Sequence, residues 1–252
     1  MVSKKSISKF QVILLTITSS LIFSCSTTET DPLNEGLVAH YTFDGNANDS
    51  SPNNLNATVF GATLTTDRKG VANGAYSFDG DNDYVSINHN ALFNFEDSDY
   101  TISLWVMTAE DQVAHNGIND ILRKWNGNAE GYPYAISYRN NTVIDDNTDK
   151  FFFGIYNGQT CGQTASDTSN EVDNNSFSHI VIKRESNVIF QFVNDILVGS
   201  FSDLQTCSTA NTANVTIGCR GNLVRFFKGK IDDVRFYDRA LSKAEITDLY
   251  TE

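Results

Sequence analysis

Short apolar or alternating segments, separated by polar turns, run through most of the chain. Segments of this length, rich in β-branched and aromatic residues, are typical of β-strands. The Gly, Asn, Asp and Ser clusters between them, such as DGNANDSSPNN and NGNAEG, are typical of turns. The pattern predicts strands at Leu37–Phe43, Tyr76–Phe78, Tyr84–Ile87, Tyr100–Met107, Ile118–Trp125, Tyr134–Tyr138, Phe151–Tyr156, Phe177–Lys183, Val188–Val193, Ile196–Phe201, Val215–Ile217 and Ile231–Tyr237.

The strand predicted at Tyr100–Met107 shows how the sheets are expected to pack. Its even-numbered residues are all large and apolar, whereas its odd-numbered residues mix Thr and Ser with Trp105 and Met107. One face should therefore be covered completely and the other face partly. Because no helices alternate with the strands, a βαβ plan is excluded. The pattern predicts an all-β fold of two antiparallel sheets packed face to face.

One helix is expected, at the carboxyl end of the chain. Ser242 and Glu245 have the spacing of a capping box, in which each side chain caps the backbone of the other residue. Ile246, Leu249 and Tyr250 then form a narrow apolar stripe at helical spacing. The sequence therefore predicts a short C-terminal helix.

The first 24 residues have the composition of a secretion signal. Lys4, Lys5 and Lys9 precede an apolar run from Phe10 to Phe23. This run is shorter than the roughly 20 residues that a membrane-spanning helix needs, and Thr and Ser dilute it. Residues 1–24 are therefore expected to direct the chain across the inner membrane.

The four residues Ile22-Phe23-Ser24-Cys25 resemble the lipobox of bacterial lipoproteins. This resemblance implies that Cys25 is acylated and becomes the first residue of a membrane-anchored protein. Ser26, rather than Asp, after the cysteine is compatible with sorting to the outer membrane. An ordinary secretory peptide is the alternative. Residues 25–35 are polar and without periodicity, and we expect them to form a flexible tether.

Composition narrows the function further. The chain has 252 residues, with 18 basic and 31 acidic side chains and a net charge of -13. Removal of residues 1–24 takes away three lysines and no acid, so the remaining chain is still more acidic. Nucleic acid is therefore excluded as a partner, because phosphate binding needs clustered Lys and Arg. Residues 36–252 are long enough for a single β-sandwich domain.

Three cysteines remain for the exported domain. Cys161 and Cys207 lie in polar loop sequence, where two thiols could meet in an oxidising compartment. Cys219 follows a predicted strand and is expected to be a small buried side chain. We expect a Cys161–Cys207 disulfide. A Cys207–Cys219 bridge and the absence of any bridge are the alternatives, because geometry decides the pairing.

Five longer motifs follow one another along the chain. They are LVAHYTFDG from Leu37, YSFDGDNDYV from Tyr76, YTISLWV from Tyr100, FSHIVI from Phe177 and GKIDDVRFYDRALS from Gly229. These motifs resemble those of LamG-like jelly-roll domains of the concanavalin A-like lectin/glucanase superfamily. They follow the order of that family and span residues 36–252, which implies a concanavalin A-like jelly-roll sandwich. Phe177 stands where the family commonly has Trp, a change that a packing position would tolerate.

The resemblance also implies a metal site. The first and last strands of such domains lie side by side, and a structural calcium often sits where the termini meet. Calcium takes six to eight oxygen ligands from carboxylates, amides and carbonyls. We therefore predict Ca²⁺, with Asp44, Asn46, Asp49 and Asp232 as candidate ligands. The alternative is that Asp44 and Asn46 only build a turn through side-chain hydrogen bonds to the backbone.

Catalytic motifs are lacking. The retaining glucanases of this superfamily carry Glu-x-Asp-x-x-Glu on one strand, and the nearest match here is Glu171-Val-Asp173-Asn-Asn-Ser176. Ser176 occupies the position of the general acid and cannot donate a proton at a useful pKa. The segment also has the sequence of a loop. We therefore predict that the chain is not an enzyme.

Glycan binding needs exposed aromatic rings with polar neighbours. Trp125 ends a predicted strand and opens a loop to Tyr132, and these residues could also simply cover the sandwich edge. We predict a non-catalytic, lipid-anchored envelope protein that binds a polysaccharide or a protein or glycoprotein surface. The alternatives are a carbohydrate-active enzyme with an unrecognised catalytic set and a purely structural envelope protein. The predicted binding residues are Trp125, Tyr132, Tyr134, Arg139 and Tyr156.

Overall fold

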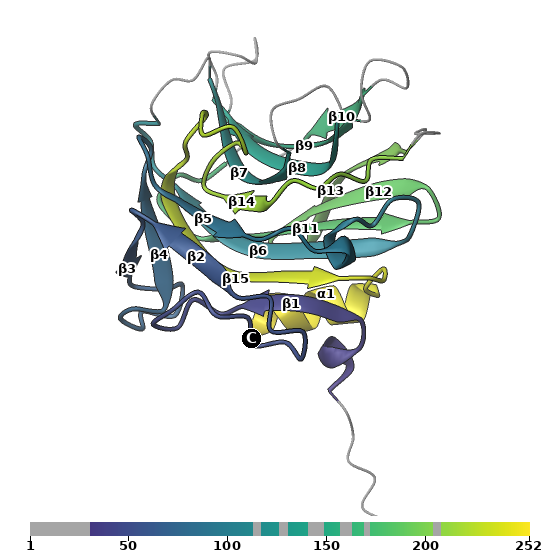
Figure 1. Ribbon diagram of the computed structural model, residues 1–252, viewed down its shortest axis with the longest axis horizontal. Helices are drawn as coiled ribbons and strands as arrows, with labels where there is room; N and C mark the ends of the chain where they lie inside the picture. The colour runs from purple at the N-terminus through teal and green to yellow at the C-terminus, as the bar shows by residue number, and fades with distance from the viewer. Residues whose placement is uncertain are drawn as a thin grey trace, which may run out of the picture. The chain divides into compact units, whose positions relative to one another are not determined.

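Two antiparallel β-sheets pack face to face, and a single α-helix covers the outer side of one of them (Figure 1). The computed structural model describes residues 31–112, 117–125, 131–140, 149–156, 163–168, 172–203 and 208–252. The predicted two-sheet sandwich with a C-terminal helix is therefore confirmed.

The larger sheet has eight strands in the order β13-β12-β11-β6-β15-β4-β3, with β1 also paired to β15. Two short 3-10 helices, Pro32–Asn34 and Ala91–Phe93, lie outside the sheets. The strands of this sheet are β1 (Leu37–Tyr41), β3 (Thr63–Thr65), β4 (Ala75–Asp79), β6 (Tyr100–Thr108), β11 (Ser178–Glu185), β12 (Val188–Val193), β13 (Ile196–Ser202) and β15 (Lys228–Tyr237).

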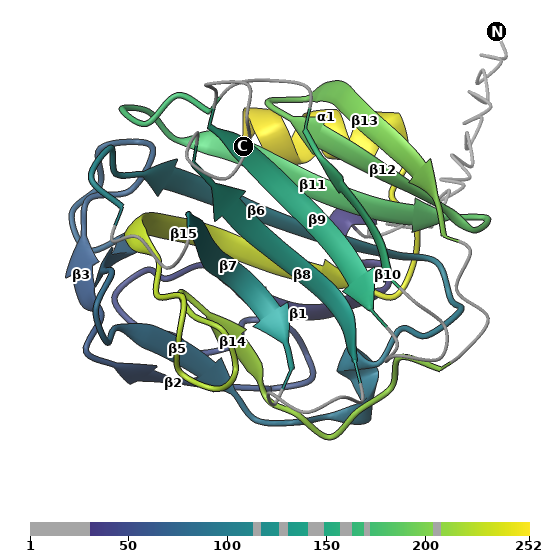
Figure 2. The same cartoon turned by 90° about the horizontal axis from the view of Figure 1, so that it is seen from above.

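The smaller sheet has seven strands in the order β10-β9-β8-β7-β14-β5-β2. Figure 2 looks onto this sheet, with β7, β8 and β9 side by side at its centre. Its strands are β2 (Ala57–Phe60), β5 (Tyr84–Ile87), β7 (Ile118–Lys124), β8 (Tyr132–Arg139), β9 (Lys150–Tyr156), β10 (Gln163–Asp167) and β14 (Val215–Ile217).

Strand β15 joins both ends of the domain to the larger sheet. Its first half pairs with β4 and its second half with β1, so the first and last strands lie side by side as predicted. A bulge between Asp232 and Arg235 separates the two halves, and Asp233 has a positive φ of 48°. The bulge turns the carboxylates of Asp232 and Asp233 toward Arg68.

The main core lies between the two sheets. Tyr100, Ile102, Leu104 and Val106 of β6 are buried in it, which confirms the predicted inward face of this strand. Alternate residues of the opposing sheet meet them, because successive side chains of a strand point to opposite faces. These opposing residues include Tyr134, Ile136, Tyr138, Phe151, Phe153 and Ile155.

A second core lies between the larger sheet and α1 (Lys243–Thr251). The predicted capping box is present, with Ser242 and Glu245 each capping the other's backbone. Ile246 and Leu249 of the helix pack against Tyr237 of β15. The helix therefore covers part of the outer face of the sheet, as the mixed odd-numbered residues of β6 indicate.

The structure also contains three strands that the sequence pattern does not predict, β2, β3 and β10. Each of them is the last strand at one end of its sheet. An edge strand pairs on one side only and needs few apolar residues, so its hydrophobic pattern is weak. The short sequences ATVF and TLT illustrate this.

Cys219 is buried and free, as expected for a small core side chain, and so it excludes the alternative Cys207–Cys219 bridge. Cys25, Cys161 and Cys207 lie outside the described residues, as do the segment 1–24 and the first residues of the tether. Among the helices that the structure describes, none has the length and apolar character needed to span a membrane.

Candidate functional site

The outer face of the seven-stranded sheet carries a cavity of about 300 Å³, which we call the arginine pocket. Strands β7, β8 and β9 form its floor, and the turn after β14 forms one wall. Its volume is at the lower end of the range for ligand pockets, so it suits a short segment of a ligand. It is lined by Ile118, Arg123, Trp125, Tyr132, Ser137, Arg139, Phe152, Tyr156, Arg220 and Arg225.

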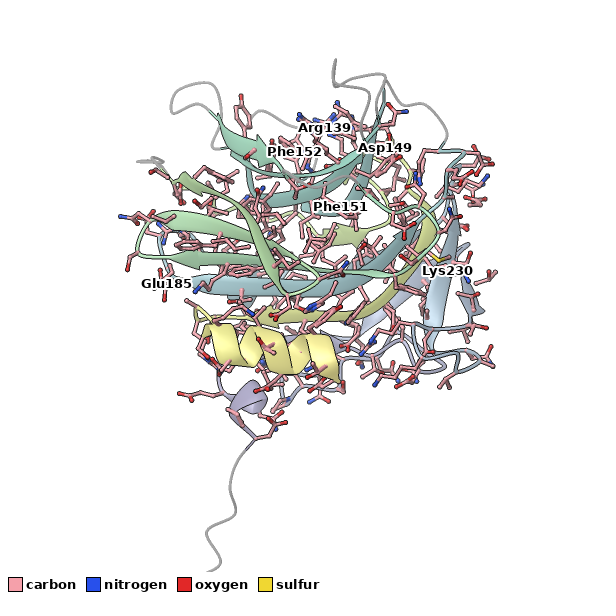
Figure 3. All side chains as sticks on the ribbon, turned by 180° about the vertical axis from the view of Figure 1, so that it is seen from behind. Arg139, Asp149, Phe151, Phe152, Glu185 and Lys230 are labelled. Carbon is pink, nitrogen blue, oxygen red and sulfur yellow. The ribbon has the colours of Figure 1, made fainter. Side chains whose placement is uncertain are left out.

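Strand alternation decides which side chains reach the pocket. On β9, Phe151 and Phe153 point into the core, whereas Phe152 points outward. Figure 3 shows Phe152 beside Arg139 on the outer side of the sheet and Phe151 between the two sheets. The guanidinium carbon of Arg139 lies 3.6 Å from the centre of the Phe152 ring.

Four of the five predicted binding residues line the pocket together, namely Trp125, Tyr132, Arg139 and Tyr156. Tyr134 does not, because its ring lies in the main core and is 0% exposed. A bulge between Tyr132 and Ala135 reverses the alternation of β8, so Tyr132 faces out while Tyr134 faces in. The prediction for Tyr134 is therefore wrong.

Guanidinium groups cover the aromatic rings of the pocket. The guanidinium carbon of Arg220 lies 3.6 Å from the centre of the Trp125 ring, and that of Arg123 lies 4.3 Å from the centre of the Tyr132 ring. Trp125 is only 9% exposed as a result. The half-buried residues that line the pocket include Arg139, Arg220, Arg225 and Tyr156.

A buried carboxylate fixes one side of the pocket. Asp120 is 0% exposed and accepts hydrogen bonds from Nη1 of Arg123 and from Oγ of Ser137, each at 2.6 Å. This buried pairing positions Arg123 against the Tyr132 ring. Burial, together with the positive charges of Arg123 and Arg225, lowers the pKa of Arg220 to about 10. Arg220 is still a cation at neutral pH.

A tight turn after β14 brings in Arg220 and Arg225. The backbone N–H of Arg220 donates to the carbonyl of Val224 at 2.9 Å, and the N–H of Asp120 donates to the carbonyl of Arg225 at 2.9 Å. The sequence interpretation missed both residues and Arg123. Arg123 has the same i, i+2 relation to Trp125 that places residues on one face of a strand, and this signal could have revealed it.

The candidate calcium ligands are engaged elsewhere. Both carboxylate oxygens of Asp49 accept hydrogen bonds, Oδ1 from the N–H of His40 on β1 at 2.9 Å and Oδ2 from the N–H of Leu55 at 2.8 Å. Oδ2 of Asp232 pairs with Nη1 of Arg68 at 2.7 Å. Protein donors therefore already use both oxygens of Asp49 and one oxygen of Asp232, which a cation would have to displace or share.

Asp44 and Asn46 belong to an exposed turn. The side-chain amide of Asn46 donates to the carbonyl of Asp44 at 3.3 Å, and its Oδ1 accepts from the N–H of Asn48 at 2.8 Å. This matches the alternative interpretation of these residues as turn formers. Among the described residues, no group of three or more His, Cys, Asp or Glu side chains is arranged to hold a metal ion. The hydrogen bonds of Asp49 and Asp232 therefore do not favour the predicted calcium site, although Asp44 and Asp232 line one cavity.

One Ser–His pair has the distance of a nucleophile and its base. Oγ of Ser103 and Nε2 of His179 lie 2.8 Å apart, but both residues are buried. Trp105 stacks on the His179 ring at 4.8 Å, and Tyr250 stacks on Trp105. Burial lowers the pKa of His179 to about 3, so the imidazole is a weak base and is closed off from ligands.

Comparison with family models adds one match. The model for the concanavalin A-like lectin/glucanases superfamily matches residues 79–247, which is more than half of the chain. The chain belongs to this superfamily. The resemblance in the strand motifs is thereby confirmed. A comparison with curated proteins gives no match.

Solved structures share the fold at low identity. Domain 4 of AbnA, an extracellular arabinanase of Geobacillus stearothermophilus in complex with arabinotriose, has a TM-score of 0.66 and 20% identity, covering 85% of this chain and 98% of that domain. The binding domain of Paraclostridial Mosquitocidal Protein 1 has a TM-score of 0.67 and 19% identity, with 86% of this chain and 52% of that one covered.

The binding domain of botulinum neurotoxin DC, solved in complex with SialylT, has a TM-score of 0.65 and 15% identity, with coverages of 87% and 52%. This chain thus spans about half the length of the two toxin domains. These neighbours are binding domains or were solved with a bound ligand, and at 15–20% identity they show the fold alone.

Proposed function

We propose that this chain is a non-catalytic carbohydrate-binding protein whose ligand site is the arginine pocket. The observation that carries the proposal is the convergence of Trp125, Tyr132, Tyr156 and several arginines in one cavity. The half-buried ring of Tyr156 can pack on sugar C–H groups, whereas Trp125 and Tyr132 hold guanidinium groups that can donate hydrogen bonds to sugar oxygens. Among the described residues, none of those that line the cavity is a carboxylate. The paired acids of a glycosidase are therefore lacking there.

The structural neighbours support this proposal. Domain 4 of AbnA was solved with arabinotriose, and its length matches that of this domain. Both toxin structures are of binding domains. A concanavalin A-like sandwich that presents a polar, aromatic cavity on one sheet face is thus suited to hold a glycan, or the glycan of a glycoprotein.

A glycan-array screen of the purified chain, followed by calorimetry on each hit, tests the proposal. We expect Tyr156→Ala to weaken binding by about tenfold, because its half-buried ring borders the cavity. Tyr84→Ala is the matched control. Tyr84 is also half-buried, but it lies on β5 and stacks on Phe60, outside the cavity. Equal loss in both variants, or no binding to any glycan, would refute the proposal.

The enzyme alternative has one observation in its favour. Asp232 and Asp233 border a second cavity of about 310 Å³, and burial raises the pKa of Asp232 to about 6. Hydrogen bonds from His40 and Arg235 hold the pKa of Asp233 low despite its burial. Acid and base pairs often show such divergent values. However, Arg68 binds both carboxylates, at 2.7 and 2.9 Å. Release of products from a bound glycan, abolished by Asp232→Asn, would establish this alternative.

We further propose that Cys25 is a lipid anchor that holds the domain on the cell envelope, with an outer-membrane location. The lipobox-like Ile22-Phe23-Ser24-Cys25 and the polar residues that follow support this. Metabolic labelling with a radioactive fatty acid tests it, since Cys25→Ser should abolish incorporation and release the chain from membranes. Label retained in Cys25→Ser would exclude the anchor.

A further inference from the structure

The arginine pocket has the opposite charge to the rest of the chain. The chain has a net charge of -13, yet Arg123, Arg139, Arg220 and Arg225 all line one cavity of about 300 Å³. Because the whole protein is acidic, it repels polyanions at long range. Nonspecific attraction of anions to the protein therefore does not explain why four arginines line one cavity. The concentration of guanidinium groups therefore points to a specific ligand.

Two arginines of the pocket have no carboxylate partner in the part of the chain that the structure describes. Asp120 pairs with Arg123 at 2.6 Å, whereas Arg220 and Arg225 form no ion pair with any carboxylate in the described ranges. The Nε atoms of Arg123 and Arg220 are also buried without a hydrogen-bond acceptor among the described residues. Buried donors without acceptors are unfavourable, so an acceptor supplied by a ligand would stabilise the pocket.

The aromatic rings hold the guanidinium groups by their faces. Trp125 lies under Arg220 at 3.6 Å, and Tyr132 lies under Arg123 at 4.3 Å. A guanidinium that stacks on a ring has its N–H donors in its own plane, so they run parallel to the ring face and can bind other groups. Such a fork matches the two oxygens of a carboxylate, or those of a sulfate, better than it matches single hydroxyl groups. The rings thus preorganise the arginines for an oxyanion.

We propose that the arginine pocket binds an acidic glycan, whose sugars carry uronate carboxylates or sulfate esters. The inference rests on the proposed carbohydrate-binding function and names the class of sugar. Arg220 and Arg225 supply the uncompensated charge, Arg123 supplies a donor fixed by Asp120, and the ring of Tyr156 lies against the sugar. Burial and the positive charges of Arg123 and Arg225 lower the pKa of Arg220. A bound anion would reduce the repulsion among these arginines and stabilise the charged form of Arg220.

The test compares polymers that differ only in charge. Polygalacturonate is compared with its full methyl ester, and dextran sulfate with dextran, by calorimetry on the purified chain. We expect binding to at least one acidic polymer and at least tenfold weaker binding to its neutral counterpart, because charge-assisted hydrogen bonds are lost. The polygalacturonate arm identifies a carboxylate and the dextran sulfate arm a sulfate. Added salt should weaken the acidic complex.

Substitutions of single arginines test which positive charges bind the acidic polymer. We expect Arg220→Gln and Arg225→Gln each to weaken binding of the acidic polymer by roughly tenfold. Lys69→Gln is the control, because it removes one positive charge from an exposed residue outside the pocket and changes the net charge equally. It should change affinity by less than about twofold. Arg220→Lys keeps the charge but not the fork, and we expect an intermediate loss.

The outcomes separate this inference from the proposed function. Equal binding of acidic and neutral polymers, with Tyr156→Ala still impaired, would overturn the acidic preference and leave glycan binding intact. The same holds if Lys69→Gln weakens binding as much as Arg220→Gln does. No binding to any polymer or array glycan would overturn both.

Discussion

The guanidinium of Arg68 lies against the carboxylate of Asp232, with Nη1 2.7 Å from Oδ2. Its Nη2 reaches Oδ2 of Asp233 at 2.9 Å, so one arginine from the loop after β3 holds both acids at the bulge of β15. The Arg68 guanidinium also lies 4.9 Å from the centre of the Trp105 ring. Arg68 therefore connects the loop after β3 to β15 and to β6, which are far apart in the sequence.

We expect Arg68→Ala to lower the free energy of unfolding by about 3 kcal/mol, because it leaves two largely buried carboxylates without this cation. Urea denaturation followed by fluorescence measures the change. Lys69→Ala is the matched control, since the neighbouring side chain is exposed and should contribute less than about 0.5 kcal/mol. Similar midpoints for the two variants would show that the ion pairs are unimportant for stability.

His179 should make stability depend on pH. Burial lowers its pKa to about 3, whereas the unfolded chain titrates near 6.5. Between these values the unfolded state binds a proton that the folded state does not. The free energy of unfolding contributed by this residue therefore falls as pH decreases from about 6.5 toward 3.

Asp232 changes the pH dependence of the free energy of unfolding in the opposite direction to His179. Burial raises its folded pKa to about 6, so the folded state binds this proton first and gains stability as pH falls below that value. Thermal melts of wild type and His179→Gln between about pH 4 and 7 isolate the histidine, since Asp232 is common to both. We expect the variant to lose less stability toward acid. Parallel profiles would contradict the assignment to His179.

Gly218 should not tolerate a side chain. It has a φ of 86°, and a Cβ atom there would lie 2.4 Å from Cδ1 of the buried Phe78 ring. We expect Gly218→Ala to cost about 3 kcal/mol, from the left-handed backbone and the overlap together. Gly45 has a similar φ of 77° with nothing within 4 Å, so Gly45→Ala should cost only about 1 kcal/mol. Chemical denaturation measures the free energy of unfolding of both variants. An equal loss in Gly218→Ala and Gly45→Ala would show that the overlap with Phe78 contributes nothing and that the backbone conformation accounts for the loss.

Calcium is not expected to stabilise the domain through the four predicted residues. Protein donors bind both oxygens of Asp49 and one oxygen of Asp232, so we expect the same thermal midpoint in calcium and in chelator. Scanning calorimetry provides the measurement. A midpoint raised by calcium in wild type but not in Asp49→Asn would reinstate the sequence prediction.

Local sequence was sufficient for much of the fold. The predicted strand Val188–Val193 coincides with β12, and Tyr84–Ile87 coincides with β5, because alternation and flanking turns mark central strands clearly. The capping box at Ser242 and Glu245 likewise fixes the start of α1 through contacts within one turn. Edge strands such as β2 gave too weak a pattern to be found.

The site required the tertiary structure. Trp125 and Tyr132 could be selected because they are aromatic residues at a strand end. Tyr134 faces the core with Ile136 and Tyr138, and only a bulge that the hydrophobic pattern does not reveal turns Tyr132 outward. Arg220 and Arg225 join Arg123 only because β14 pairs with β7 across a long stretch of sequence. Sequence alone determined the alternating, two-sheet architecture, since that depends on neighbours along a strand. The cluster of guanidinium groups depends on strand pairing and backbone bulges, which only folding of the whole domain decides.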